Sequence, residues 1–406
     1  MKKVRLVSLL ALAAASLTGL AGCNKKAAAD VTVGLICLHG SYSTYDNNFI
    51  VAMKEAQKKL GFKLAISEDI EEGTGCYDEA KKLAQQGCNI IFADSFGHES
   101  HMIKAAREFK DVLFCHATGV SAANDDVNLG NFGDAFASIY EGRYLAGVAG
   151  GLRMKADIEA GKYTAADAKV GYVGAFTYAE IISGFTSFYL GVKSVVPEAT
   201  MEVKYSGSWY DENAERTIAL ELINDYGCKL ISQHADSHGA PTACQSKGVP
   251  NVSYNGSTLS DGPDTYLISS RINWAPYYEH VINGYLEAKK AGKAPTVEND
   301  WAGGLKNGSV EVDACSKNCP AGAQEKVDAV KKQLEDGTLR VFDLSKFTVG
   351  GEAPNAENMK PGAATWANAP AGDKLLKDGY YHESEFRSAP SFDVIIDGIH
   401  NINTAF

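Results

Sequence analysis

The sequence lacks the short motifs by which many enzymes are recognised. It contains no Gly-x-Ser-x-Gly elbow, no Gly-x-x-x-x-Gly-Lys-Ser/Thr phosphate loop and no Gly-x-Gly-x-x-Gly dinucleotide turn. No cysteine and histidine spacing resembles a zinc site, and in His98-Glu99-Ser100-His101 the histidines are too close together for the His-Glu-x-x-His motif. We therefore expect a protein that is not an enzyme and that needs no metal or cofactor.

Positive charge is also scarce, since 39 lysines and arginines face 50 acidic residues and the net charge is −11. An acidic chain repels phosphate backbones, which argues against a nucleic-acid partner. Long hydrophobic runs are missing as well. The apolar run from Val7 to Leu17 follows Lys2, Lys3 and Arg5 and is too short to span a membrane.

The end of that apolar run is Leu20-Ala21-Gly22-Cys23, which resembles a bacterial lipobox. The resemblance implies cleavage before Cys23, diacylation of its thiol, and a membrane-anchored protein that faces the periplasm or the cell exterior. We expect residues 1–22 to be the signal peptide and residues 23–30 a tether. Loss of the signal removes three positive charges and moves the net charge from −11 to −14. The remaining chain of about 380 residues exceeds the usual single core, so we expect two domains.

Nine cysteines are many for this length. With Cys23 assigned to lipid an even eight remain, and in an exported chain pairing is favoured over free thiols. Cys315 and Cys319, in one loop before Pro320, are the first disulfide candidates, and Cys228 with Cys244, which flank one strand and loop, are the second. The alternative is that cysteines inside apolar runs are simply buried.

Strands and helices alternate along the chain with the period of an α/β fold. Near-continuous apolar runs predict strands at 31–38, 63–66, 89–93 and 112–117, and again at 169–173, 202–205, 229–232 and 251–254. Helical patterns fill the gaps, among them 49–60 and 135–154, and a further strand is expected at 339–343. The repeat predicts two lobes, each with a parallel sheet between helices.

Aromatic and polar residues gather where the predicted strands end. Carboxyl ends of parallel strands, with the helix N-termini beside them, offer ligands a site, and we expect Asp46 or Asn47 to cap the helix that follows the first strand. Stacked aromatic rings with carboxylate and amide acceptors suit a flat heterocycle bearing hydroxyl groups. The candidate ligand-binding residues are Tyr45, Asp46, Asn47, Phe49, Ser95, Phe96, Tyr178, Trp209, Asp211, His234, Asp236, Asn255 and Trp274.

Seven stretches make the chain resemble the basic membrane protein (BMP) family of solute-binding lipoproteins, whose best-known members are purine-nucleoside receptors of ABC transporters. They are Tyr45-Asp-Asn-Asn-Phe49, Tyr140-Glu-Gly-Arg-Tyr-Leu-Ala-Gly147, Lys169-Val-Gly-Tyr-Val-Gly174, Gly207-Ser-Trp-Tyr-Asp211, Gln233-His-Ala-Asp-Ser-His-Gly239, Ser269-Ser-Arg-Ile-Asn-Trp274 and Trp301-Ala-Gly-Gly-Leu305. The resemblance implies a type I periplasmic-binding-protein fold, with two Rossmann-like lobes, a three-strand hinge and a ligand held between the lobes. It places residues 31–132 and about 271–300 in lobe 1, residues 133–270 and about 301–345 in lobe 2, and residues 346–406 in an extension.

By the same likeness, Phe49 and Trp209 would sandwich the base of a purine nucleoside, and Asp46 with Asn47 would bind its edge. Asp236 and Asn255 would meet the ribose hydroxyls. The family's Val-Asp-x-Asp-Gln stretch is here Tyr254-Asn-Gly-Ser257, its glycine-rich loop is replaced by residues 234–238, and a lysine after the hinge strand is replaced by Arg271. These departures fall where sugar contacts are expected and leave a free nucleobase or another polar solute open.

The expected partners are the small-molecule ligand, ABC permease subunits and the membrane that holds the lipid anchor, with a monomeric chain. A surface lipoprotein that senses a ligand or interacts with a host, without transport, is the alternative function.

Overall fold

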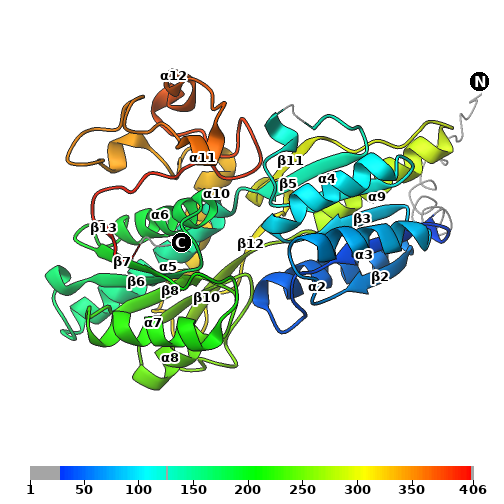
Figure 1. Cartoon of the computed structure of the whole chain (residues 1–406). Coiled ribbons are helices and arrows are strands. Elements are labelled where there is room, and N and C mark those ends of the chain that lie inside the picture. Colours follow the sequence, from blue (N-terminus) through cyan, green and yellow to red (C-terminus); the bar gives the residue numbers. More distant parts are fainter. Residues whose placement is uncertain (1–27, 125–126, 404–406) are drawn as a thin grey trace, which may run out of the picture.

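The computed structural model describes residues 28–124 and 127–403 and shows two α/β lobes side by side (Figure 1). Cys23, the expected signal peptide and most of the expected tether lie outside the described residues. Ala28 is buried in the core of the first lobe, so the chain belongs to the folded lobe from Ala28 on, three residues before the expected end of the tether at Val31. In the described part of the chain, none of the helices combines the length and the hydropathy that crossing a membrane requires.

Lobe 1 holds a six-stranded parallel sheet with the order β11-β5-β4-β3-β1-β2. Helices α2 and α9 pack together beside the sheet, as do α3 and α4, whose buried residues form a separate apolar cluster. The bounds are β1 Thr32–Ile36, α2 Thr44–Leu60, β2 Lys63–Ser67, α3 Thr74–Gln85, β3 Ile90–Ala93, α4 Glu99–Glu108, β4 Leu113–Ala117, β5 Phe132–Ala137, α9 Ala275–Lys290 and β11 Asp300–Gly303.

Lobe 2 holds a seven-stranded sheet with the order β12-β10-β9-β8-β6-β7-β13, parallel except that β12 runs antiparallel to β10. Helices α5 and α6 pack together, as do α7 and α8. The bounds are α5 Ile139–Glu159, β6 Lys169–Gly174, α6 Ala179–Lys193, β7 Thr200–Tyr205, α7 Glu212–Asn224, β8 Leu230–His234, α8 Gly239–Lys247, β9 Asn251–Tyr254, β10 Tyr266–Ile272, β12 Val310–Val312, α10 Ala323–Asp336 and β13 Ile399–Asn401.

The chain crosses between the sheets three times, after β5, after β10 and after β11. This is the predicted three-strand hinge between two parallel-sheet lobes. The expected boundaries at 132 and 300 are too early, because β5 and β11 both belong to the first sheet and pair with each other. Part of the predicted helix 135–154 is therefore strand β5, and the helix itself begins at Ile139.

Close approach of α5 and α6 depends on glycine. A Cβ atom on Gly147 would lie 2.1 Å from the carbonyl oxygen of Phe188, and one on Gly191 would lie 2.2 Å from that of Tyr144. Real Cβ atoms essentially never come within 3.0 Å of another heavy atom. Without side chains at these two positions the helix backbones can touch, and α5 can carry Arg143 into the centre of lobe 2.

The C-terminal segment, residues 346–401, lies over lobe 2 (orange to red in Figure 1). It contains the short helices α11 Ala363–Trp366 and α12 Gly372–Leu375, and it ends in β13, which extends the second sheet beside β7. Phe392 stacks on Phe342 with ring centroids 4.4 Å apart. The strand expected at 339–343 is absent, since that stretch is turn and loop in the described chain and only Asp343 forms an isolated bridge, to Tyr380.

All eight described cysteines are free thiols. Cys228 and Cys244 are buried in one apolar cluster of lobe 2, so the second disulfide candidate is not formed. Cys315 and Cys319 are unpaired too, but they are half-buried and their thiols are hydrogen-bonded neighbours. Pairing of these two stays a prediction.

Candidate functional site

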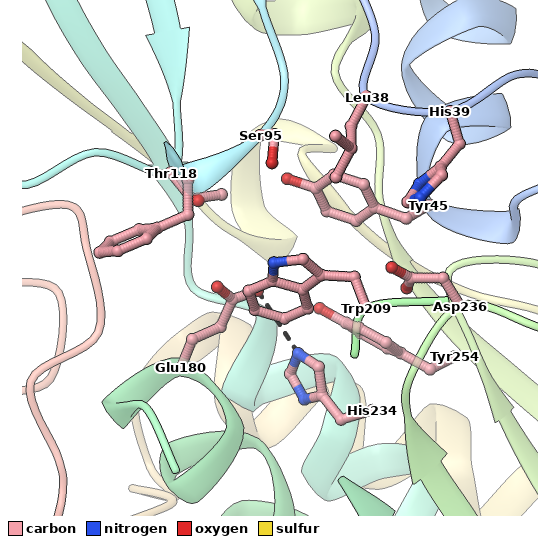
Figure 2. Close-up of a pocket in the computed structure, with 11 residues that line it drawn as sticks. Leu38, His39, Tyr45, Ser95, Thr118, Glu180, Trp209, His234, Asp236 and Tyr254 are labelled. Atoms are coloured by element: carbon pink, nitrogen blue, oxygen red, sulfur yellow. Dashed lines mark hydrogen bonds and ion pairs between the residues drawn. The ribbon is translucent and has the colours of Figure 1, made fainter. Parts of the chain in front are cut away.

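A narrow pocket lies between the two lobes, where strands of both sheets end (Figure 2). Lobe 1 contributes Leu38, His39, Tyr45, Ser95, Phe96 and Thr118, and lobe 2 contributes Glu180, Trp209, His234, Asp236 and Tyr254. Nearly all of them stand at the end of a strand or in the loop that follows it. The cavity volume is about 20 Å³, which suits roughly one water molecule. A larger ligand therefore enters only when the lobes move apart.

Tyr45 forms the wall on the side of lobe 1. Its helix α2 begins at Thr44 because Ser43 caps it by accepting from the N–H of Asp46, so the stretch from Tyr45 to Phe49 is helix and not loop. The Tyr45 hydroxyl donates to the backbone carbonyl of Asp94 over 2.6 Å. Burial, together with neighbouring carboxylates, raises the pKa of Tyr45, which therefore stays a neutral phenol.

Asp46 does not reach the pocket but holds the loop that does. Its carboxylate is fully buried and accepts from the His39 N–H over 2.8 Å and from the Ser43 hydroxyl over 2.6 Å. Burial alone would raise the pKa of Asp46, yet these hydrogen bonds keep it below its ordinary value. The ionised carboxylate therefore fixes the turn that presents Leu38 and His39. The expectation that Asp46 or Asn47 caps the helix is wrong, since Ser43 does.

Trp209 forms the facing wall from lobe 2. Its indole meets Phe176 edge to face at 5.0 Å between centroids, and its backbone carbonyl accepts from the N–H of Asp236. Figure 2 shows Tyr45 and Trp209 facing each other across the pocket. Two aromatic rings from opposite lobes provide the surfaces between which a flat ligand can be held.

Acidic groups occupy the rest of the lobe 2 wall. Asp236 is only 4% exposed, and burial raises its pKa well above the ordinary value. Glu180 Oε1 lies 3.4 Å from Nε2 of His234. Burial lowers the pKa of His234, so that ring is neutral at neutral pH, and its Nδ1 has no hydrogen-bond partner.

Arg143 supports the pocket from behind. It is fully buried and donates to Ser253 O, Ser270 Oγ, Tyr172 Oη and Ser232 Oγ, so that one side chain joins strands β6, β8, β9 and β10. Its guanidinium also lies 5.1 Å from the centroid of the Tyr254 ring. Hydroxyl and carbonyl oxygens bind its two terminal nitrogens and aromatic faces surround it, while Nε has no partner among the described residues. The side chain therefore forms a firm support behind Tyr254.

The two lobes touch directly around the pocket. The N–H and hydroxyl of Thr44 both donate to the carbonyl of Asp236 over 3.2 Å. The rings of Phe96 and Tyr178 meet at 5.4 Å on one side, and those of Tyr42 and Tyr210 meet at 5.4 Å on another. Opening the pocket has to break these contacts.

Six of the predicted ligand-binding residues line the pocket: Tyr45, Ser95, Phe96, Trp209, His234 and Asp236. Tyr178 lies at the rim beside Phe96, whereas Asn47 and Asn255 line a neighbouring cavity of about 390 Å³ between the lobes. Asp211 is outside the pocket, where it caps helix α7 by accepting from the N–H of Ala214.

Phe49 and Trp274 do not take the predicted place. Both are buried and stack on each other at 4.5 Å in the core of lobe 1. Phe49 lies one helical turn below Tyr45, at 4.9 Å between ring centroids. The expected sandwich of Phe49 with Trp209 is therefore wrong, and the ring that lines the pocket opposite Trp209 is Tyr45.

Sequence reasoning missed five lining residues: Leu38, His39, Thr118, Glu180 and Tyr254. Each stands within three residues of a strand end or of a residue that was selected. The ends of the parallel strands are therefore the signal that could have found them, and Tyr254, the last residue of β9, is the clearest case.

Two groups of potential metal ligands lie in lobe 1, Glu99 with His116 and Asp134, and Cys37 with Asp46 and Asp94. In the first group the carboxylates already accept from the N–H groups of Val120, Ser121 and Ala122. They therefore serve to hold the loop that carries Thr118. In the second group, Asp46 is occupied as described above.

Known proteins match this architecture. The sequence model of the family described as "ABC transporter substrate-binding protein PnrA-like" matches residues 42–339. A purine-binding protein of Brucella abortus is 31% identical over 76% of this chain and 83% of its own length. A putative ABC transporter glucose-binding protein of Haloferax volcanii is 30% identical over 66% of this chain and 62% of its own length.

A solved structure shows the same fold. The solute-binding protein of an ABC transporter system from Conexibacter woesei superimposes with a TM-score of 0.59, covering 76% of this chain and 98% of its own. The sequence identity of 21% limits this likeness to the fold, a type I solute-binding protein with two lobes. The C-terminal segment lies beyond the residues that the family model matches.

Proposed function

The chain belongs to the family of PnrA-like ABC transporter substrate-binding proteins, and on this premise we propose that it captures a purine base or purine nucleoside and delivers it to an ABC permease. The single observation that carries the ligand class is the pair of facing rings, Tyr45 from lobe 1 and Trp209 from lobe 2. Between them a flat heterocycle gains stacking on both faces. The name of the Brucella abortus relative, which refers to purine, supports the same class.

Capture follows from the two-lobe geometry. Ligand contacts on both walls are complete only when the lobes are together, so binding shifts the equilibrium toward the closed form. Ser95 and Thr118 on one wall and Asp236 on the other offer polar contacts to the edges of the base. Asn47 and Asn255 line the neighbouring cavity, and their amide groups would bind the hydroxyl groups of a ribose.

The ligand is tested by thermal unfolding of the purified protein with adenine, hypoxanthine, adenosine, inosine, glucose and amino acids. A ligand at a hundred times its dissociation constant adds about 2.7 kcal/mol to the free energy of unfolding, which is visible as a raised melting temperature. Glucose is included because one relative is named for it. A shift with glucose or amino acids and none with purines would refute the proposed ligand class.

The stacking argument has its own test. Trp209→Ala should weaken purine binding by about 1–3 kcal/mol, the usual contribution of a base stacked on an aromatic ring. Phe386→Ala is the matched control, since this exposed ring lies on the C-terminal segment away from the pocket. Affinity within twofold of the wild type for Trp209→Ala, measured by calorimetry, would remove Trp209 from the site.

We further propose that the protein is a monomer that Cys23 anchors to the membrane through diacylation. Cys23→Ala should move the protein from the membrane fraction to the soluble fraction. Purine uptake by cells that lack the protein tests delivery to a permease, and unchanged uptake would argue for a role in ligand sensing.

A further inference from the structure

The C-terminal segment, which covers lobe 2, also touches lobe 1. It lies beyond residues 42–339 that the family model matches, and its last strand, β13, pairs with β7 of lobe 2 (red in Figure 1). The N–H of Ser388 in this segment donates to Oδ2 of Asp300 over 2.8 Å. Asp300 is the first residue of β11, the edge strand of lobe 1. The segment therefore links the two lobes at a place outside the ligand pocket.

Ser388 lies in a loop, residues 383–392, that we call the clasp. The side chain of Glu383 closes the base of this loop, because its Oε2 accepts from the N–H and the hydroxyl of Ser391 and from the N–H of Phe392, over 2.8–3.0 Å. Arg387 stiffens its tip, since its guanidinium donates to backbone carbonyls of the clasp itself. The clasp is therefore a loop of fixed shape.

The clasp is anchored to lobe 2. The hydroxyl of Tyr140, in the first turn of α5, donates to the carbonyl of Glu383 over 3.1 Å. The ring of Phe342 contacts Tyr140 on one side, at 5.4 Å between centroids, and stacks on Phe392 of the clasp at 4.4 Å. When the lobes rotate relative to each other, the clasp moves with lobe 2 and Asp300 moves with lobe 1.

Asp300 lies close to the hinge but not on it. The crossings after β5 and β11 lie side by side, since the N–H of Ser138 donates to the carbonyl of Gly303 over 2.8 Å. Asp300 is three residues before Gly303, which is about 10 Å along a strand. A rotation of about 15° at the crossings displaces a point at that distance by roughly 2.5 Å. A displacement of this size away from Ser388 breaks their hydrogen bond.

The hydrogen bond is buried and does not depend on charge. Ser388 is 1% exposed, so water does not replace Asp300 as the acceptor of its N–H while the lobes are together. Burial raises the pKa of Asp300, and a carboxyl oxygen accepts this hydrogen bond in the neutral and in the ionised form. Loss of the acceptor would leave a buried N–H unpaired in the closed arrangement of the lobes.

We propose that the clasp fastens the lobes in their closed arrangement, through a hydrogen bond between Ser388 and Asp300 that forms on closure and breaks on opening. The two are positioning residues, since neither lines the pocket. They strengthen ligand binding from outside the site, because whatever stabilises the closed form favours the ligand-bound state. This inference rests on closure around a ligand and not on the ligand being a purine.

The test compares the full-length wild type with Asp300→Ala, which removes the acceptor, and with Asp300→Asn, which keeps an acceptor oxygen and removes the charge. Asp397→Ala is the matched control. It removes a carboxylate that accepts from the N–H groups of Gly350 and Gly351, all within the C-terminal segment, and it leaves the link to lobe 1 intact. Calorimetry measures adenosine binding, and small-angle X-ray scattering measures the radius of gyration with and without adenosine.

Asp300→Ala should disfavour the closed form about tenfold. Where the scattering shows that the free wild type is mostly open, the dissociation constant for adenosine rises about tenfold in this variant. Where the free wild type is mostly closed, the free variant has the larger radius of gyration. Asp300→Asn and Asp397→Ala should match the wild type in both measurements, although Asp397→Ala lowers the free energy of unfolding.

Amide hydrogen exchange of the wild type gives a second measurement, which decides the matter should Asp300→Ala fail to fold. The peptide that contains Ser388 should exchange more slowly when adenosine saturates the protein, because exchange of this N–H requires opening. An unchanged rate would show that the link does not follow the movement of the lobes.

The clasp is overturned if Asp300→Ala binds adenosine within twofold of the wild type and has the same radius of gyration. An equal loss of affinity in Asp300→Asn and Asp300→Ala would assign the effect to the charge of Asp300 and overturn it as well. If adenosine, adenine, hypoxanthine and inosine all fail to bind, the proposed ligand class falls. The same variants are then titrated with glucose or the amino acid that raises the melting temperature, so the clasp is tested separately.

Discussion

Replacing glycine by alanine should have opposite effects on the free energy of unfolding at Gly147, in the contact of helices α5 and α6, and at Gly284, in helix α9. Gly147→Ala places a Cβ atom 2.1 Å from the carbonyl oxygen of Phe188, which belongs to the backbone and cannot rotate away. The helices have to separate by about 1 Å to bring this distance to 3.0 Å, the shortest that real Cβ atoms adopt, and by more to reach an ordinary contact. Overpacking of this kind costs about 1–3 kcal/mol, and a backbone neighbour puts it at the upper end. Alanine regains about 1 kcal/mol of helix propensity, so we expect a net loss of about 2 kcal/mol.

Gly284→Ala in α9 is the matched control. A Cβ atom there meets no heavy atom within 4 Å, and the position is exposed on a regular helix. Only the higher helix propensity of alanine then acts, so this variant should be more stable than the wild type by about 0.5–1 kcal/mol. Urea unfolding followed by circular dichroism measures both variants through the shift in midpoint. The two should differ by about 3 kcal/mol, with the wild type between them.

Gly191, which lies across the same contact from Gly147, provides a second test. Gly191→Ala should cost a similar amount, because its Cβ atom would lie 2.2 Å from the carbonyl of Tyr144 across the same contact. The double variant should cost less than the two singles together, since helices already forced apart accommodate the second methyl group. A Gly147→Ala protein at least as stable as the Gly284→Ala protein would refute this account of the interface.

Two further predictions concern titration and thiol chemistry. Burial raises the pKa of Glu215 to about 7, although the N–H groups of Asp211 and Ser237 donate to it. The contribution of Glu215 to stability therefore falls by roughly 3 kcal/mol as pH rises from about 4.5 to about 7. Glu215→Gln should remove this part of the pH dependence, measured by urea unfolding at about pH 5 and pH 8. The same change in stability between these pH values for wild type and variant would contradict the prediction. If Cys315 and Cys319 pair after export, a non-reduced tryptic digest should keep the peptides on either side of Lys317 joined, whereas two separately alkylated peptides would show free thiols. The six buried cysteines should react with iodoacetamide only after denaturation.

The alternation of apolar runs was enough to predict the two lobes, because strands buried on both faces are apolar at nearly every position. Strand β3 shows this, with all four of its residues buried. Strand β5 was not predicted, because Asp134 lies in its centre and interrupts the apolar run. That carboxylate is buried beside His116, at 3.2 Å between Oδ1 and Nδ1. His116 belongs to another strand, so the sequence around Asp134 does not show that the carboxylate has a partner.

The site could be predicted at the level of strand ends but not of single rings. Tyr45 and Phe49 are one helical turn apart and share a face of α2, so the sequence alone could not say which reaches the pocket. The start of the helix at Thr44 decides it, since the first turn carries Tyr45 to the pocket and the second buries Phe49 against Trp274. Glu180 was missed because its role depends on His234, which lies 54 residues later and meets it only in the fold.

Both sheets take an edge strand from late in the chain, and this governs the order of folding. Lobe 1 contains β1 to β5 but receives β11 only from residues 300–303, and lobe 2 receives β13 only from residues 399–401. The chain is made with its N-terminus first, and β5 ends at Ala137, whereas its partner β11 begins at Asp300, 163 residues later. Until then, one edge of β5 has no neighbouring strand. Pairings of such long range are slow, because loop closure comes before the contacts that reward it. The unfinished edges at β5 and β7 are therefore the places where the newly made protein is open to wrong pairing.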